Sequence, residues 1–264
     1  MKFGMPNLVE CASLLECAEL AKAEGLDFIE INMSFPEFIP ARFDIENANK
    51  IAKEYGLFYT IHVDEALNPF DFNKSVSDCY FTVMRDTIRT ARKINAKVLN
   101  LHLQKGIYVT LPEKVILLTD VYKDEYLGAV KSFIAMCEEE IGDSEIKISI
   151  ENVDSNPFST SQLTALELFL ESKVFCLTLD TGHECKLNYK DSHVYEKYPD
   201  KLLHMHLHDC KTGSPHLPLG VGEVDIDKKL TQHMGDTTLI EVKTVEGLIE
   251  SVKYLRKRGI KNDK

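Results

Sequence analysis

Strand-like and helix-like stretches alternate from one end of the chain to the other, and this alternation constrains the fold more than any other feature. The strand-like stretches are short and rich in apolar residues, and they cover 2–5, 28–32, 58–62, 98–102, 147–151, 174–180, 202–208 and 238–242. Each is followed by a stretch with helical periodicity, and these cover 8–23, 45–55, 76–94, 112–140, 160–171, 191–198, 227–233 and 245–258. Strands that alternate with helices predict a parallel sheet.

Eight such units in 264 residues predict a single closed (β/α)8 barrel with eight parallel strands, which occupies residues 1–264 as one domain. No Gly/Ser-rich linker or shift in composition divides the chain. The second predicted helix stops at Gly56, a typical C-terminal signal. In barrels of this kind, functional groups lie at the carboxyl ends of the strands.

Six of the strand-like stretches carry, near that end, a residue that can bind a divalent metal. These residues are His62, His102, Glu151, Asp180, His206 and Glu241. Side chains alternate between the two faces of a strand, so in each stretch Ile, Leu or Met points one way and the ligand points the other way. The six ligands are therefore expected to converge inside the barrel and to form a metal site.

The residue types narrow the choice of metal to Zn, Mn, Co or Fe. Mixed imidazole and carboxylate groups suit these ions better than Ca or Mg, which prefer oxygen alone. No Cys occupies a strand-end position, which argues against a structural thiolate zinc site. The alternative for each buried carboxylate is an ion pair, and Lys147 is the nearby inward-facing cation. We expect one or two ions of Zn, Mn or Co per chain.

Three residues outside the strand ends are candidates for binding a substrate. His183 follows Asp180 by three residues, where a turn would bring it back to the site. His216 lies in a Gly/Pro-rich loop predicted above the barrel, and Lys211 at the start of this loop could bind an anionic group.

Four further histidines are assigned structural roles. His204 shares the inward face of its strand and is predicted to pack in the core, and His208 with Asp209 is predicted to shape the rim. His193 and His233 lie in helical stretches and are predicted to be on the surface.

Composition excludes several classes of protein. The net charge of −11 disfavours a broad electropositive surface for nucleic acid. No apolar run approaches the ~20 residues of a membrane span, and the first six residues do not read as a signal peptide. Seven Cys form no C-x-x-C pair and are expected to be reduced thiols. These features predict a cytoplasmic protein.

Four motifs resemble those of the xylose isomerase-like TIM barrel superfamily. They are Ser149-Ile150-Glu151-Asn152, Leu179-Asp180-Thr181-Gly182-His183, His206-Leu207-His208-Asp209 and His216-x-x-Leu219-Gly220-x-Gly222. The superfamily includes sugar isomerases, ketose 3-epimerases and the endonuclease IV branch (AP endonuclease family 2). The resemblance runs from the first strand to the last helix.

The resemblance to the epimerases implies an enzyme of carbohydrate metabolism. Glu151, Asp180, His206 and Glu241 would bind one divalent metal, Glu151 and Glu241 would act as the acid/base pair, and His183 would contact the substrate. The predicted function is therefore a metal-dependent isomerase or epimerase of a small sugar, sugar phosphate or polyol. Dimers and tetramers are frequent among barrels of this kind, so a homo-oligomer is an alternative that rests on this analogy alone.

The resemblance to the endonuclease IV branch implies an alternative, a zinc phosphodiester hydrolase acting on abasic DNA. One zinc would be bound by His62, His102 and Glu151, and a second by Asp180, His206 and Glu241. A third would need His183, His216 and an Asp at the position of Ser214, so this chain fills eight of the nine positions. A metal-stabilised barrel used only for binding is the non-enzymatic alternative.

Overall fold

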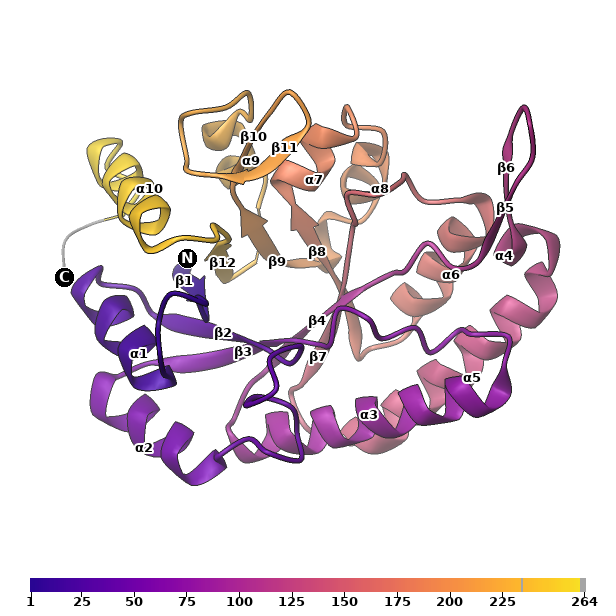
Figure 1. Cartoon of the computed structure of the whole chain (residues 1–264), viewed down its shortest axis with the longest axis horizontal. Coiled ribbons are helices and arrows are strands. Elements are labelled where there is room, and N and C mark those ends of the chain that lie inside the picture. The colour runs from indigo at the N-terminus through magenta and orange to yellow at the C-terminus, as the bar shows by residue number, and fades with distance from the viewer. Residues whose placement is uncertain (234, 262–264) are drawn as a thin grey trace.

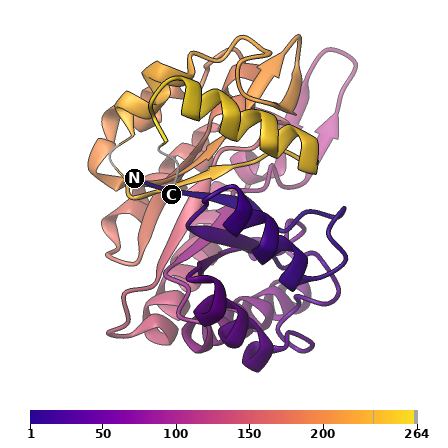
Figure 2. The ribbon, with the colours of Figure 1, turned by 90° about the vertical axis from the view of Figure 1, so that its left-hand side faces the viewer.

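The computed structural model describes residues 1–233 and 235–261. Eight parallel strands close into a barrel in the order β1-β12-β9-β8-β7-β4-β3-β2 (Figure 1), which confirms the predicted (β/α)8 fold. The strands are β1 (Lys2–Pro6), β2 (Phe28–Asn32), β3 (Phe58–His62), β4 (Val98–His102), β7 (Lys147–Glu151), β8 (Phe175–Asp180), β9 (Leu202–Leu207) and β12 (Thr237–Ile240). Strand β12 pairs with β1, so the barrel closes between the two ends of the chain (Figure 2).

Helices surround the barrel. They are α1 (Leu14–Ala23), α2 (Ile45–Tyr55), α3 (Lys74–Lys93), α4 (Leu118–Val121), α5 (Lys123–Ile141), α6 (Thr160–Glu171), α7 (Thr181–Lys186), α8 (Ser192–Lys197), the 3-10 helix η1 (Pro199–Lys201), α9 (Ile226–Gln232) and α10 (Val245–Lys257). Helix α2 ends at Gly56 in the left-handed conformation, as its sequence predicts. None of the described helices combines the length and apolar character that crossing a membrane requires.

The helix predicted over 112–140 is wrong at its start. Residues there form an antiparallel hairpin of β5 (Tyr108–Thr110) and β6 (Val115–Leu117), which projects from the body in Figure 1. Pro112 lies in the turn, where the amide of Leu111 donates to the carbonyl of Lys114. Pro favours a turn and β-branched Val115 and Ile116 favour a strand, and these local preferences override the helical periodicity.

The loop predicted over 211–222 also contains a strand. Strand β11 (Ser214–Leu217) pairs antiparallel with β10 (Asp209–Lys211). The Asp209 carboxylate accepts hydrogen bonds from the amides of Gly220, Gly222 and Val224 at 3.0, 2.8 and 3.0 Å. A Cβ on Gly222 would lie 2.3 Å from Asp209 Oδ1, so only glycine permits this approach. Asp209 thus shapes the rim, as predicted.

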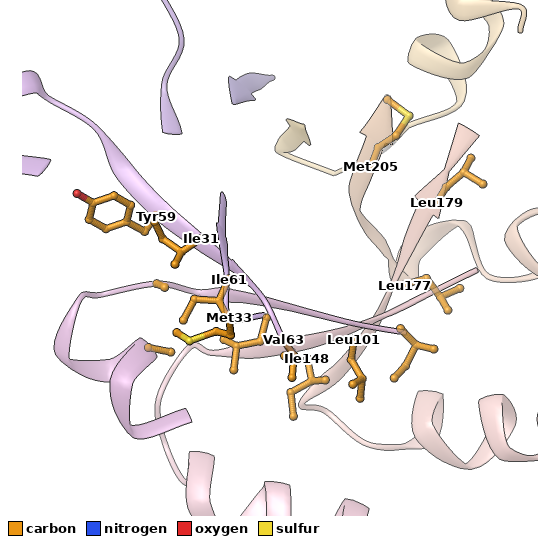
Figure 3. Close-up of a cluster of buried hydrophobic side chains, with 14 of the residues drawn as sticks. Ile31, Met33, Tyr59, Ile61, Val63, Leu101, Ile148, Leu177, Leu179 and Met205 are labelled. Carbon is orange, nitrogen blue, oxygen red and sulfur yellow. The ribbon is translucent and has the colours of Figure 1, made fainter. Parts of the chain in front are cut away.

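The apolar core lies between the barrel wall and the helices. Figure 3 shows Ile61, Leu101, Ile148 and Leu177 from successive strands, all fully buried. Each such side chain contributes about 1.5–3 kcal/mol of transfer free energy. The inward faces of the barrel strands are instead rich in buried polar residues. These are Glu30, Thr60, Asn100, Ser149, Thr178, His204 and Thr237. The barrel interior is therefore a polar shaft that ends at the site.

Candidate metal centre and active site

The six predicted strand-end ligands lie together at the carboxyl end of the barrel. The ligand atoms of Glu151, Asp180, His206 and Glu241 all lie within 4.8 Å of one another. Those of His62, His102 and Glu151 form a second such group, so Glu151 belongs to both. All six side chains are buried except that of His102, which is partly exposed.

Strand register produces this convergence. His102 is level with Glu151 on the neighbouring strand, and Asp180 is level with His206. Because parallel strands in register present the same face at the same height, their ligands meet without any contribution from the loops. Glu241 lies just beyond β12, and its amide donates to the carbonyl of Leu207 at 3.1 Å.

His206 is the centre of the first group. Its Nδ1 lies 2.9 Å from Glu241 Oε2, 3.1 Å from Glu151 Oε1 and 3.9 Å from Asp180 Oδ2. Among the described residues, His206 Nδ1, Glu151 Oε1 and Glu241 Oε2 are buried without a hydrogen-bond partner. Buried polar atoms are almost always partnered. A cation between them would satisfy all three atoms, so the donor set fits a divalent metal.

The electrostatics also favour a cation. Burial alone would raise the pKa of the Glu151 carboxyl, but His206 and His102 hold it well below its usual range. Burial likewise opposes ionisation of Glu241, yet Lys243 and His206 keep its pKa low. Burial disfavours a charged His206, but the facing carboxylates, Glu151 first, raise its pKa well above the ordinary value. The buried carboxylates therefore favour positive charge at the centre of this group.

The second group surrounds the other oxygen of Glu151. His102 Nε2 lies 3.2 Å and His62 Nε2 3.5 Å from Glu151 Oε2, and the Asn100 amide donates to the same oxygen. His62 Nδ1–H donates to the carbonyl of Val63 at 2.8 Å, which leaves Nε2 directed at the site. Burial lowers the pKa of His62, but Glu151 outweighs it and raises the value to about 9.

His183 and His216 both reach the site, as predicted. Asp180 caps helix α7, because its Oδ1 accepts the amide of His183 at 2.7 Å, and this places the His183 ring over the cluster. The rings of His183 and His216 are 5.3 Å apart. His183 Nδ1–H donates to the Asn152 carbonyl at 3.1 Å, so Nε2 is available. Lys211 is exposed on β10 and is not among the residues brought together here.

Three histidines outside the six predicted ligands have buried rings, and one of them was predicted to be on the surface. His204 is buried, as predicted, but its ring is hydrogen-bonded to Thr237 Oγ1 at 2.7 Å and contacts Glu30. His208 is fully buried, and its Nε2 lies 2.8 Å from Asp180 Oδ1. His233 was predicted on the surface and is only 6% exposed, so that prediction is wrong. The predicted exposure of His193 is confirmed.

Two charged residues at the site were missed. Lys243 Nζ lies 2.7 Å from Glu241 Oε1, and although burial opposes it, this carboxylate raises the pKa of Lys243. Glu30 is 1% exposed and lies 3.0 Å from His206 Nε2. Both were detectable, since Lys243 follows Glu241 by two residues and Glu30 is a charged residue in an apolar strand.

A cavity of about 330 Å³ opens beside the predicted metal ligands. Its lining comprises Pro6, Asn7, Leu8, Val9, Glu30, Asn32, Phe35, His62, Glu65, Leu239, Glu241 and Lys243. A larger cavity of about 490 Å³ lies among α7, α8 and α9, but its lining includes none of the six ligands. The smaller cavity is the better substrate candidate because Glu241 and His62 form part of its wall.

Comparisons with known proteins agree on the architecture. A family model described as xylose isomerase-like TIM barrel matches residues 18–258. No curated protein sequence matches the chain. A solved structure of a D-tagatose 3-epimerase-like protein is 23% identical, with a TM-score of 0.78 and 98% of each chain covered.

Two other solved structures have the same fold. One is 3-keto-D-glucoside 4-epimerase YcjR from E. coli, at 16% identity and a TM-score of 0.78, with 97% of this chain and 99% of that chain covered. The other is the IolI protein with a bound zinc atom, at 16% identity and a TM-score of 0.74, with 98% of this chain and 97% of that chain covered. At these identities the likeness shows the fold alone.

Proposed function

Because the chain belongs to the xylose isomerase-like TIM barrel family, we propose that it is a divalent-metal-dependent isomerase or epimerase of a small sugar. The observation that carries the proposal is that the two oxygens of each carboxylate, in Glu151 and in Glu241, face different partners. Each directs one oxygen at His206 Nδ1, at 3.1 and 2.9 Å, and its other oxygen away from it. One oxygen of each carboxylate can therefore bind a metal while the other handles a proton.

The proposed metal site consists of Glu151, Asp180, His206 and Glu241. A divalent cation bound there would act as a Lewis acid that polarises a carbonyl and its neighbouring hydroxyl, which acidifies the adjacent C–H. Zinc, manganese and cobalt all suit these ligands. The zinc in the structure of the IolI protein supports the first of them.

Glu151 and Glu241 are the proposed acid/base pair. One carboxylate would take the proton from the substrate carbon, and the other would return a proton to the opposite face in an epimerisation. The oxygens that face away from His206, Glu151 Oε2 and Glu241 Oε1, have different neighbours. His102 and Asn100 contact Glu151 Oε2, whereas Lys243 contacts Glu241 Oε1. Each of these oxygens is thus held in position, and each has a titratable neighbour, His102 or Lys243, with which it can exchange a proton.

His183 and His216 would bind and orient the sugar. His183 offers Nε2 to a hydroxyl, because its Nδ1 is bonded to the main chain. His216 is fixed by its own amide, which donates to His208 Nδ1 at 2.7 Å. Both rings stand over the carboxylate cluster and would exclude water from it.

The charges at the cavity favour an uncharged sugar over a sugar phosphate. Glu30, Glu65 and Glu241 line the cavity, and Lys243, the only Lys or Arg in its lining, is already paired with Glu241. A phosphate in this lining would lose its hydration without gaining an unpaired Lys or Arg partner.

The test is a panel of free ketoses and aldoses and their phosphates, assayed with protein of measured metal content. We expect turnover of a free sugar that a chelator abolishes and added metal restores. Glu151→Gln and Glu241→Gln should each lower kcat by about 10²–10⁴-fold, whereas Glu54→Gln, an exposed carboxylate on α2, should not. Full activity in both site variants would overturn the acid/base assignment.

The same preparation tests the nuclease alternative. Metal-dependent nicking of an abasic duplex, with no sugar turned over, would replace the proposed function. Ser214, at the position of the missing third-zinc ligand, is exposed on β11, which weighs against that outcome. The metal content of His62→Ala and His102→Ala distinguishes a second bound ion from substrate contacts by these histidines.

A further inference from the structure

Glu30 lies one layer below the proposed metal site and takes no part in the chemistry described above. It lies in the middle of β2, 1% exposed, and faces the barrel interior. Its Oε1 lies 3.0 Å from His206 Nε2, and its Oε2 lies 3.1 Å from His204 Nε2 and accepts from Thr60 Oγ1 at 2.7 Å. A buried carboxylate is costly unless each oxygen has a partner, and Oε2 has two, whereas Oε1 faces His206 Nε2 without a hydrogen bond.

The geometry determines which nitrogen of His206 is free to bind a metal. An ionised carboxylate only accepts hydrogen bonds, so the nitrogen that faces Glu30 must carry the proton. In a neutral His206 this is Nε2, and the lone pair is then on Nδ1. Nδ1 is the atom that lies 2.9 Å from Glu241 and 3.1 Å from Glu151.

His204 fixes the other oxygen of Glu30 by the same logic. Its Nε2 faces the carboxylate and carries a proton, so its Nδ1 accepts from the hydroxyl of Thr237 at 2.7 Å. The chain Thr237–His204–Glu30–His206 therefore runs from the base of the shaft to the metal cluster. Its members come from β12, β9 and β2, so residues of three strands fix the position of the His206 ring.

We propose that Glu30 is the positioning residue of the metal site, which holds the Nε2–H of His206 and thereby directs Nδ1 to the cation. The proposal rests on the metal of the proposed function. His206 Nε2 and Glu30 Oε1 are in contact but not aligned as a hydrogen bond in the metal-free arrangement. A small rotation of the ring on metal binding would align them, and the negative charge of Glu30 would make the ligand more basic.

The main test is the affinity for Zn²⁺, measured by competition with a chromogenic chelator, for the wild type, Glu30→Gln and Glu30→Ala. Loss of such an outer partner lowers metal affinity by about 10–100-fold, and we expect that loss in Glu30→Gln. Thr178→Val is the matched control. It removes a buried hydrogen bond to Ser149 at 2.6 Å in the same shaft, and it should bind Zn²⁺ as the wild type does.

The outcomes separate this proposal from the proposed function. A wild type that binds no metal would refute the function, whereas a folded Glu30→Gln with wild-type affinity would refute only the role of Glu30. Thermal unfolding of the metal-free proteins checks that the affinity change is not a folding defect.

A second measurement needs no variant of Glu30. Long-range ¹H–¹⁵N NMR of the zinc-loaded wild type should show a histidine with a proton on Nε2 and zinc on Nδ1, assigned to His206 through its loss in His206→Asn. Glu30, His204 and His206 could themselves form a metal site. Zinc on His206 Nε2, bound together with Glu30 and His204, would therefore overturn the proposal.

Discussion

Gly182 is the position at which one methyl group should damage the site most clearly. It is the second residue of α7, next to His183, and a Cβ built there would lie 2.1 Å from Cε1 and 2.2 Å from Nδ1 of His208. To reach an ordinary contact of 3.4 Å, the His208 ring must retreat by about 1.3 Å. Gly182→Ala therefore tests how firmly this ring is held.

The cost follows from what the ring would lose. His208 Nε2 lies 2.8 Å from Asp180 Oδ1, and Nδ1 accepts the amide of His216 at 2.7 Å. A shift of that size breaks both bonds, which contribute about 1.5–3 and 0.5–1.5 kcal/mol. Ala is favoured over Gly in a helix by about 0.5–1 kcal/mol. The expected net loss is about 1–4 kcal/mol of unfolding free energy.

Chemical denaturation of metal-free protein measures the loss, and Gly128→Ala provides the matched control. Gly128 lies in the middle of α5, where an added Cβ meets no atom within 4 Å. That variant should gain about 0.5–1 kcal/mol, the opposite sign for the same chemical change. If Gly182→Ala unfolds within 0.5 kcal/mol of the wild type, the His208–Asp180 contact does not fix this part of the site.

Three further predictions follow. Chelation should lower the melting temperature, because metal at 100 times its Kd stabilises the folded state by about 2.7 kcal/mol; equal values with and without chelator would contradict a tightly bound ion. Lys243→Met should lower kcat/KM for the sugar at least tenfold, because Glu241 Oε1 loses its partner at 2.7 Å; unchanged kinetics would remove Lys243 from the site. Burial lowers the pKa of His233 to about 4 from 6.5, so the unfolded chain binds that proton first and stability falls as pH falls from 6.5 to 4. His233→Asn should remove about 3 kcal/mol of the stability that the wild type loses between pH 6.5 and pH 4. If the unfolding free energy of the variant falls with pH as steeply as that of the wild type, His233 is not the group responsible.

The sequence predicted where the strand-end candidates lie because their positions depend on two simple rules, one for the strand and one for the barrel. A strand of period two fixes the face of Glu151 and Asp180, and a parallel barrel aligns the carboxyl ends. No knowledge of the loops is needed. Helix α7 was missed for a related reason, since its N-cap is Asp180, a residue whose side chain was assigned wholly to the metal site.

The choice of lysine shows where such reasoning ends. Lys211 follows the strand of His206 and was predicted to bind substrate. Both Lys211 and Lys243 are exposed, but it is Lys243 that contacts Glu241. The path of the chain after β9 is set by Asp209, which binds three amides 11 to 15 residues further on. Hydrogen bonds across such separations are a tertiary property that sequence spacing does not determine.

The interior charge links the stability of the barrel to its proposed chemistry. Barrel interiors of this class are usually filled with branched apolar side chains, but this one buries Glu30, Glu151 and Asp180, with Glu241 at its mouth. The nearest lysine, Lys243, is paired with Glu241, and the facing carboxylates raise the pKa of His206 well above its ordinary value. A divalent cation bound at the proposed site would take the place of a proton on His206 Nδ1 and would neutralise more charge there. Proton and metal would therefore compete for one atom, and we expect metal affinity to weaken as pH falls.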